Sequence, residues 1–145
     1  MRTPSQTVGP YYSIGLCRRP ENILVEHGAE LSGRLLDGQD DPIADGMIEL
    51  WDPAGRRWGR SGTDADGRFS FQVAEPELHF DVFVFARGLL RHQLTRIYFP
   101  GRQNDADPVF ASLDDAERLV ARQEDGRFLF DIRMQGEQAT VFFTH

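Results

Sequence analysis

The sequence predicts an all-β fold, a β-sandwich of mostly antiparallel strands with one short helix and an extended N-terminal arm. Short runs in which hydrophobic and polar residues alternate are typical of strands with one buried face. Turn residues separate these runs at intervals of roughly eight to fifteen residues, as in sandwiches. Phenylalanine, which strands favour, occurs 11 times among 145 residues.

Seven runs are predicted to be strands. They cover residues 31–35, 47–51, 68–73, 78–86, 93–99, 128–133 and 140–143. The turns are Asp37-Gly38, Asp52–Gly55 and Asp64–Gly67. The run 78–86 is apolar on both faces, which is typical of a central strand, and we expect it to form a hairpin with 93–99.

One helix is predicted after Ser112. Ser112 and Asp115 approximate a capping box, in which each residue satisfies a backbone N–H at the helix start. Acidic residues follow in the first turn, where the helix dipole favours them. We therefore expect a helix from Ser112 to about Arg122.

The length predicts one domain, divided into an arm over residues 1–28 and a sandwich domain over residues 29–145. The net charge of −7 argues against nucleic-acid binding, and no apolar run is long enough to cross a membrane. The single Cys17 forms no internal disulfide, which indicates a reducing, cytoplasmic location. Pro10 and Gly9 exclude a helix over residues 3–12, and this run is too polar for a signal peptide.

Four segments together resemble the intradiol ring-cleavage dioxygenases, in particular the alpha (non-iron) subunits of protocatechuate 3,4-dioxygenases. They are the arm T-P-S-Q-T-V-G-P-Y-Y, the strand pair L-S-G-R-L-L-D-G-Q…P-I-A-D-G-M-I-E-L-W-D, the segment H-F-D-V-F-V-F-A-R-G-L-L-R-H-Q-L-T-R-I-Y-F and the tail R-F-L-F-D-I-R-M-Q-G-E-Q-A-T-V-F-F. The second segment alone would also suit transthyretin-like or carboxypeptidase-regulatory-like modules. The combination of this segment with the arm and the F-A-R-G motif is much more specific to the intradiol dioxygenases.

The resemblance implies a cofactor that this chain does not bind by itself. Members of the family use non-haem Fe(III) held by two tyrosinates and two histidines, a donor set that suits a hard cation. His79 matches the first histidine of the H-x-H ligand pair, but Asp81 stands in the second position, and no tyrosine matches a ligand position. We therefore expect no catalytic residue and no metal here, with His79 a vestigial candidate and Fe(III) on a homologous beta subunit.

The resemblance also implies substrate-pocket residues. Matched one by one, these are Thr7, Gly9, Pro10 and Tyr11 of the arm and Arg87 of F-A-R-G. Glycine lets a backbone approach a ligand closely, and proline lowers the cost of ordering the arm. Arginine carries a fixed charge suited to the carboxylate of an aromatic acid. A simple strand-end salt bridge is the alternative role for Arg87.

The implied function is that of an alpha subunit, inactive without its beta partner, in the intradiol cleavage of protocatechuate by O2 to 3-carboxy-cis,cis-muconate, a step of aromatic catabolism in the beta-ketoadipate pathway. The alternative is a non-enzymatic transthyretin-like or carboxypeptidase-regulatory-like binding module, which would have no need of the arm. A third possibility is a stand-alone enzyme with another metal set using His79 and Asp81. Family alpha subunits are longer, and the segments 55–62 and 74–78 are shortened here.

Overall fold

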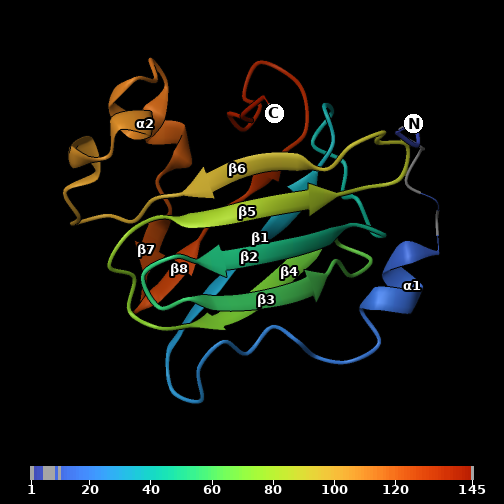
Figure 1. The fold of residues 1–145 in the computed structure, drawn as a ribbon, viewed down its shortest axis with the longest axis horizontal. Helices are drawn as coiled ribbons and strands as arrows, with labels where there is room; N and C mark the ends of the chain where they lie inside the picture. Colours follow the sequence, from blue (N-terminus) through green and yellow to red (C-terminus); the bar gives the residue numbers. More distant parts are fainter. Residues whose placement is uncertain (1, 5–8, 10, 145) are drawn as a thin grey trace.

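The computed structural model describes residues 2–4, 9 and 11–144, which fold into two stacked β-sheets (Figure 1). One sheet has the strand order β3-β2-β5-β6, and each neighbouring pair in it is antiparallel. The second has the order β4-β1-β8-β7, with β9 also paired to β1. The strands of the first sheet are β2 (Met47–Asp52), β3 (Arg57–Gly62), β5 (Phe80–Phe85) and β6 (Gln93–Ile97).

The second sheet mixes antiparallel and parallel pairs. Its strands are β1 (Ala29–Leu36), β4 (Arg68–Val73), β7 (Arg122–Glu124), β8 (Arg127–Leu129) and β9 (Ile132–Arg133). β1 pairs antiparallel with β4 but parallel with β8 and β9. The predicted β-sandwich of mostly antiparallel strands is therefore confirmed, with the closing segment as the parallel exception.

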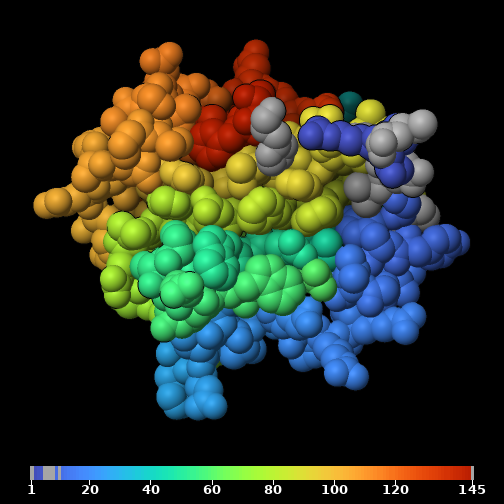
Figure 2. Space-filling model, in the orientation of Figure 1, coloured from blue at the N-terminus to red at the C-terminus, as the bar shows by residue number. Residues whose placement is uncertain are grey.

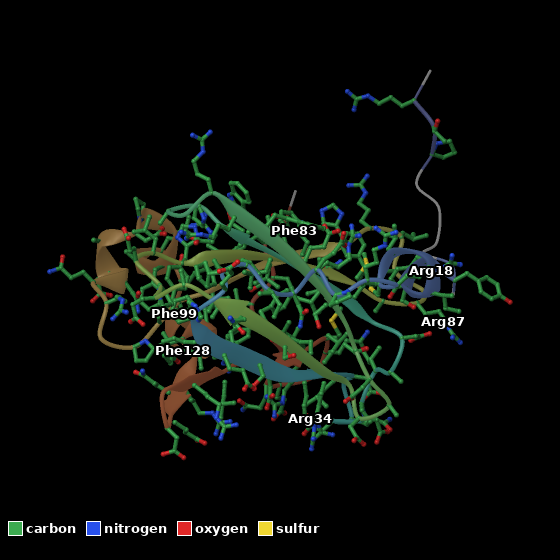
Figure 3. The ribbon with its side chains drawn as sticks, turned by 90° about the horizontal axis from the view of Figure 1, so that it is seen from below. Arg18, Arg34, Phe83, Arg87, Phe99 and Phe128 are labelled. Atoms are coloured by element: carbon green, nitrogen blue, oxygen red, sulfur yellow. The ribbon has the colours of Figure 1, made fainter. Side chains whose placement is uncertain are left out.

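The core lies between the two sheets, because every second residue of each strand points inward. In β5 the inward residues Phe80, Val82 and Val84 are buried, and the outward ones are half-buried. Figure 3 shows Phe99 and Phe128 between the layers and Phe83 on the outer side of the first sheet. The rings of Phe99 and Phe128 meet edge to face with centroids 4.9 Å apart, a favourable aromatic geometry.

The outer face of the four-stranded sheet is turned toward the viewer in Figure 2. It lies between the N-terminal segment, coloured blue, and residues 100–120, coloured orange. Its outward side chains include a cross-strand pair of tryptophans, Trp51 on β2 and Trp58 on the edge strand β3. Trp58 is 43% exposed, and the guanidinium of Arg60 lies 4.8 Å from its ring centroid.

The predicted helix from Ser112 to Arg122 is wrong. The chain instead forms a 3₁₀ turn η1 (Asn104–Ala106), a short helix α2 (Pro108–Ala111) and a second 3₁₀ turn η2 (Ala116–Leu119). Asp107 caps α2, since its side chain accepts from the Val109 amide and Pro108 suits the first helical position. Val120 then pairs with Tyr98, and this bridge to the core ends helical structure before Arg122.

Four further local expectations differ from the structure. The run 128–133, predicted as one strand, is divided into β8 and β9. Residues 57–62 form the edge strand β3, which no alternating pattern predicted. The predicted strand 140–143 is reduced to a single bridge between Phe143 and Leu94. After the N-cap residue Tyr11, residues Tyr12–Leu16 form the short helix α1, where we expected an extended arm.

The segment after α1 is fastened to both sheets. Glu21 forms a bridge with Arg60 on β3, and Ile23 forms one with Gln72 on β4. No helix in the described part of the chain has the length and apolar character needed to cross a membrane.

Candidate functional site

Strand β5 connects the two regions to which the sequence pointed. His79 stands just before the strand and Arg87 just after it. An extended strand rises about 3.3 Å per residue, so the two residues lie roughly 25 Å apart, at opposite ends of the sheet. His79, the predicted vestigial metal position, and Arg87, a predicted pocket residue, thus lie in two separate places in this chain.

His79 belongs to a cluster of four charged or titratable side chains, which we call the His79 cluster: His79, Asp81, Arg96 and Asp107. The Nε2 and Nδ1 atoms of His79 lie 3.4 Å from Asp81 Oδ1 and 3.0 Å from Asp107 Oδ2. Arg96 joins the same two carboxylates, with Nε 3.0 Å from Asp81 and Nη1 3.2 Å from Asp107. Each side chain is only 15–24% exposed.

The cluster forms because β5 and β6 are antiparallel and place Asp81 directly opposite Arg96. Asp107 reaches them from the N-cap of α2. Burial by itself raises the pKa of Asp81, but the hydrogen bond and charge of His79, with the Arg96 guanidinium, hold this pKa below its usual value. Asp81 is therefore a stable carboxylate at neutral pH.

The donor set of this cluster does not fit ferric iron. Both ring nitrogens of His79 face carboxylates, and Arg96 supplies the positive charge that a metal would bring. The nearest phenol is Tyr98, whose pKa is raised, mainly by burial, so its phenolate form is disfavoured. In residues 2–4, 9 and 11–144, no group of three or more His, Cys, Asp or Glu side chains is arranged to hold a metal ion.

A cavity of about 830 Å³ adjoins the cluster, between the end of β6 and the turns η1 and α2. Its lining includes Leu78, Arg96, Tyr98, Arg102 and Val109. The hydroxyl of Tyr98 is buried and close enough to Arg96 and Asp107 for both side chains to influence its pKa. Among the described residues, its geometry with either one falls outside that of a regular hydrogen bond.

At the other end of β5, Arg87 forms an ion pair with Asp45, with Nη2 2.5 Å from Oδ2. The oxygen is not in hydrogen-bond geometry with any described residue, so the contact is electrostatic and not directional. The Arg87 side chain is 64% exposed and borders a hollow of about 570 Å³ with Leu89, Gln93 and Met134. A guanidinium has five N–H donors, so this pair leaves donors for a ligand.

The base of the arm lies at this same end of the sheet. The Tyr12 hydroxyl is 2.6 Å from the main-chain oxygen of Asp45 and 2.9 Å from that of Phe85. Burial, followed by the charge of Asp45, raises the pKa of Tyr12 above its usual value, so the hydroxyl stays protonated and donates. Figure 3 shows Arg87 and Arg18 together at this end, beside α1.

The expected pocket residues are only partly placed by the structure. Thr7 and Pro10 lie outside the described residues. Tyr11 is 76% exposed, and a Cβ added at Gly9 would meet nothing within 4 Å. Arg87 and Tyr11 therefore share one end of the molecule as accessible side chains.

Sequence reasoning missed Tyr12, Asp45, Arg96 and Asp107. A usable signal existed for one of them: Asp107 followed by Pro108 is a common way to begin a helix, whereas the Ser112 pattern was misleading. The other three act through contacts between distant segments, for which one sequence carries no local signal.

Solved structures show the class of fold. The chain superimposes with a TM-score of 0.66 on the intradiol ring-cleavage dioxygenase of Tetranychus urticae, at 14% identity, covering 91% of this chain and 94% of that one. The architecture is therefore the β-sandwich of the intradiol dioxygenases. No family model matches the sequence.

Sequence relatives define the family more narrowly. The protocatechuate 3,4-dioxygenase alpha chain of Burkholderia cepacia is 36% identical over an alignment of 192 residues, which covers 98% of this chain and 96% of the relative. The beta chain from the same organism is 28% identical, over 76% of this chain and 65% of the relative. This chain belongs to the family of protocatechuate 3,4-dioxygenase alpha chains. Since the alignment is longer than the 145 residues of this chain, the relative carries extra residues within the matched region.

Proposed function

We propose that this chain is the alpha subunit of a protocatechuate 3,4-dioxygenase and that it shapes the substrate pocket of an iron-bearing beta subunit. Intradiol dioxygenases use non-haem Fe(III), and the donor set here does not fit that ion. The partner's iron would activate the catechol toward O2 for cleavage between its two hydroxyl-bearing carbons. The residues of this chain would bind and orient the substrate and exclude water.

The observation that carries the proposal is the separation of two regions along β5. The position that matches the family's histidine ligands is filled by the His79 cluster, in which Arg96 pairs with both carboxylates. The arm base and Arg87 instead gather at the other end, where Arg87 and Tyr11 are exposed. Because Arg87 and Tyr11 lie at the other end of β5 from His79, they are suited to line a pocket on another subunit.

Arg87 is the residue of this end best suited to recognise the substrate. Its exposed guanidinium keeps donors free beside the Asp45 carboxylate, and one carboxylate only partly offsets its charge in a wet environment. An aromatic acid could be bound through its carboxylate by two parallel hydrogen bonds. Together with Gly9 and Tyr11, and with Thr7 and Pro10 beyond the described residues, Arg87 would form this chain's share of the pocket.

The first experiment measures iron content and the visible spectrum of this chain purified alone and after co-expression with a beta homologue. Ferric tyrosinate is coloured by charge transfer, so the proposal expects a colourless chain and a coloured complex that cleaves protocatechuate. Coloured, iron-loaded protein from this chain alone would overturn the assignment of the metal to the partner. Absence of a complex with every homologue tested would overturn the subunit role.

The second experiment tests whether Arg87 binds the substrate or serves only its ion pair with Asp45. In the complex, Arg87→Ala should raise KM for protocatechuate roughly 10- to 100-fold, because a charge-assisted hydrogen bond contributes about 1.5–3 kcal/mol. Asp45→Asn removes the ion pair but keeps the guanidinium, so KM should stay near the wild-type value. Equal increases in both variants would mean that Arg87 serves only the pair. Arg91→Ala, an exposed arginine in the same turn, is the matched control.

A further inference from the structure

We infer that Tyr12 is a positioning residue for the arm: its hydroxyl, held by two main-chain carbonyls, fixes the place from which the arm leaves the sandwich. The inference rests on the proposed function, because it takes the arm to be a pocket element. It concerns a residue adjacent to Tyr11 that is expected to touch no substrate.

The contact joins three segments that are far apart in sequence. The Tyr12 oxygen is 2.6 Å from the oxygen of Asp45 and 2.9 Å from that of Phe85, which are 33 and 73 residues away. A hydroxyl has a single proton, so it donates to one carbonyl at a time or shares the proton between both. In either arrangement the ring keeps its place, because both acceptors lie within hydrogen-bond distance of the same hydroxyl oxygen.

The other end of α1 is fastened independently. Arg60 Nη1 donates to the Leu16 oxygen at 3.3 Å, and the same side chain pairs with Glu21 at 3.2 Å and Glu49 at 2.6 Å. The Arg60 amide also donates to the Glu21 oxygen at 2.8 Å. Among the described residues, Tyr12 is thus the side-chain attachment that lies nearest to Gly9 and Tyr11, and Arg60 holds the C-terminal end of α1 and the segment after it.

The helix needs these attachments. Its five residues are far too few for a stable isolated helix, and none of them is buried. Its internal bonds include Gly15 N to Tyr11 O at 3.1 Å and Cys17 N to Ser13 O at 2.9 Å. Removal of the Tyr12 hydroxyl would therefore loosen this turn, and with it the position of Tyr11 and Gly9. Small displacements of groups that orient a substrate have large effects on binding and rate.

The first test uses the chain alone, so it does not depend on a partner. Amide exchange by NMR at Gly15 and Cys17 should become about fivefold faster in Tyr12→Phe, the factor expected for loss of one partly buried hydrogen bond. Tyr98→Phe is the matched control, because it makes the same chemical change at a buried hydroxyl beside His79, at the other end of β5 from α1. Unchanged exchange in Tyr12→Phe would overturn the anchor.

The second test uses the complex with the beta homologue. Tyr12→Phe should raise KM for protocatechuate about fivefold while the yield and melting temperature of the complex stay unchanged, and Tyr98→Phe should leave KM as it is. A lower melting temperature with the wild-type KM would assign Tyr12 a merely structural role and overturn the inference. If the wild-type chain forms no active complex, the proposed function fails, and the arm-positioning role fails with it, while the exchange measurement still decides whether Tyr12 anchors α1.

Discussion

Replacement of Arg96 by methionine tests whether the His79 cluster is held together by an internal cation. Methionine keeps an unbranched chain of similar length and removes the charge. The change leaves Asp81 and Asp107 with only His79 between them, where Arg96 had contacts of 3.0 and 3.2 Å to the two carboxylates. We expect the folded state to lose stability while the fold itself persists.

The magnitude follows from the burial of the cluster. Exposed ion pairs contribute about 0–1 kcal/mol, and breaking a fully buried pair costs about 3–5 kcal/mol. Arg96, Asp81 and Asp107 are 24%, 24% and 20% exposed, which places the cluster between these limits. We expect a loss of about 2 kcal/mol in the free energy of unfolding, or about 6 °C in melting temperature for a domain of this size.

The effect should depend on pH in a defined direction. The pKa of Asp81 is lower in the folded state than in the unfolded chain, where it is about 3.9. A carboxylate of this kind contributes its full stabilisation above about pH 5 and loses it as the pH falls through the lowered folded-state pKa. The difference between wild type and Arg96→Met should therefore be constant near neutrality and shrink toward pH 3.

Urea denaturation of the isolated chain at pH 7 and at pH 3–4 measures both effects. Arg122→Met is the matched control, since Arg122 is 68% exposed and its pair with Glu124 is 3.8 Å long, and we expect a change below about 0.5 kcal/mol. A loss for Arg96→Met as small as that of the control would refute the reasoning. A difference that does not shrink in acid would refute the role assigned to Asp81.

Two further predictions concern the sandwich itself. A Cβ at Gly33 would lie 1.7 Å from the main-chain oxygen of Phe130, so Gly33→Ala must displace backbone, and we expect it to lower the unfolding free energy by about 3 kcal/mol or more. Gly15→Ala is the control, because a Cβ at Gly15 would have no atom within 4 Å, and the same assay should show no loss of unfolding free energy. Equal losses in the two variants would contradict the predicted clash at Gly33. Tyr98→Phe should raise the unfolding free energy by about 1 kcal/mol, because it removes a buried hydroxyl that is in regular hydrogen-bond geometry with no described residue. A loss of stability in urea titration would show instead that the hydroxyl is bonded to the nearby Arg96 or Asp107.

The strands that the sequence predicts well are those with a strong period of two. The alternation of Phe69, Phe71 and Val73 after an Asp–Gly turn gave β4, which spans Arg68–Val73 as expected. Strand β3 was missed because Gly59 and Gly62 interrupt any alternation. It forms because the neighbouring β2 offers a complete set of antiparallel partners. A prediction from local alternation misses a strand that is stabilised mainly by hydrogen bonds to its neighbouring strand.

The predicted helix from Ser112 to Arg122 is the opposite kind of error, because the local pattern predicted an element that does not form. The residues after Ser112 have acceptable capping and charge for a helix, yet Ala116 and Leu119 are buried in a 3₁₀ turn and Val120 bridges to Tyr98. Burial of these apolar side chains against the core outweighs the propensity of one short segment, since propensities differ by less than about 1 kcal/mol per residue.

By itself, the sequence determined the sandwich class, because hydrophobic periodicity and turn residues are local properties of a chain. The arm and the incomplete set of iron ligands stay predictions from proline positions and residue identities. Tertiary structure alone decided that Arg96 and Asp107 close around His79, and that Tyr12 fastens the arm base beside Asp45. These contacts join residues up to 73 positions apart, and they exist only once strand pairing has fixed which ends of the sheets meet. Electrostatic and hydrogen-bond energies depend on distance in space, which a single sequence does not encode locally.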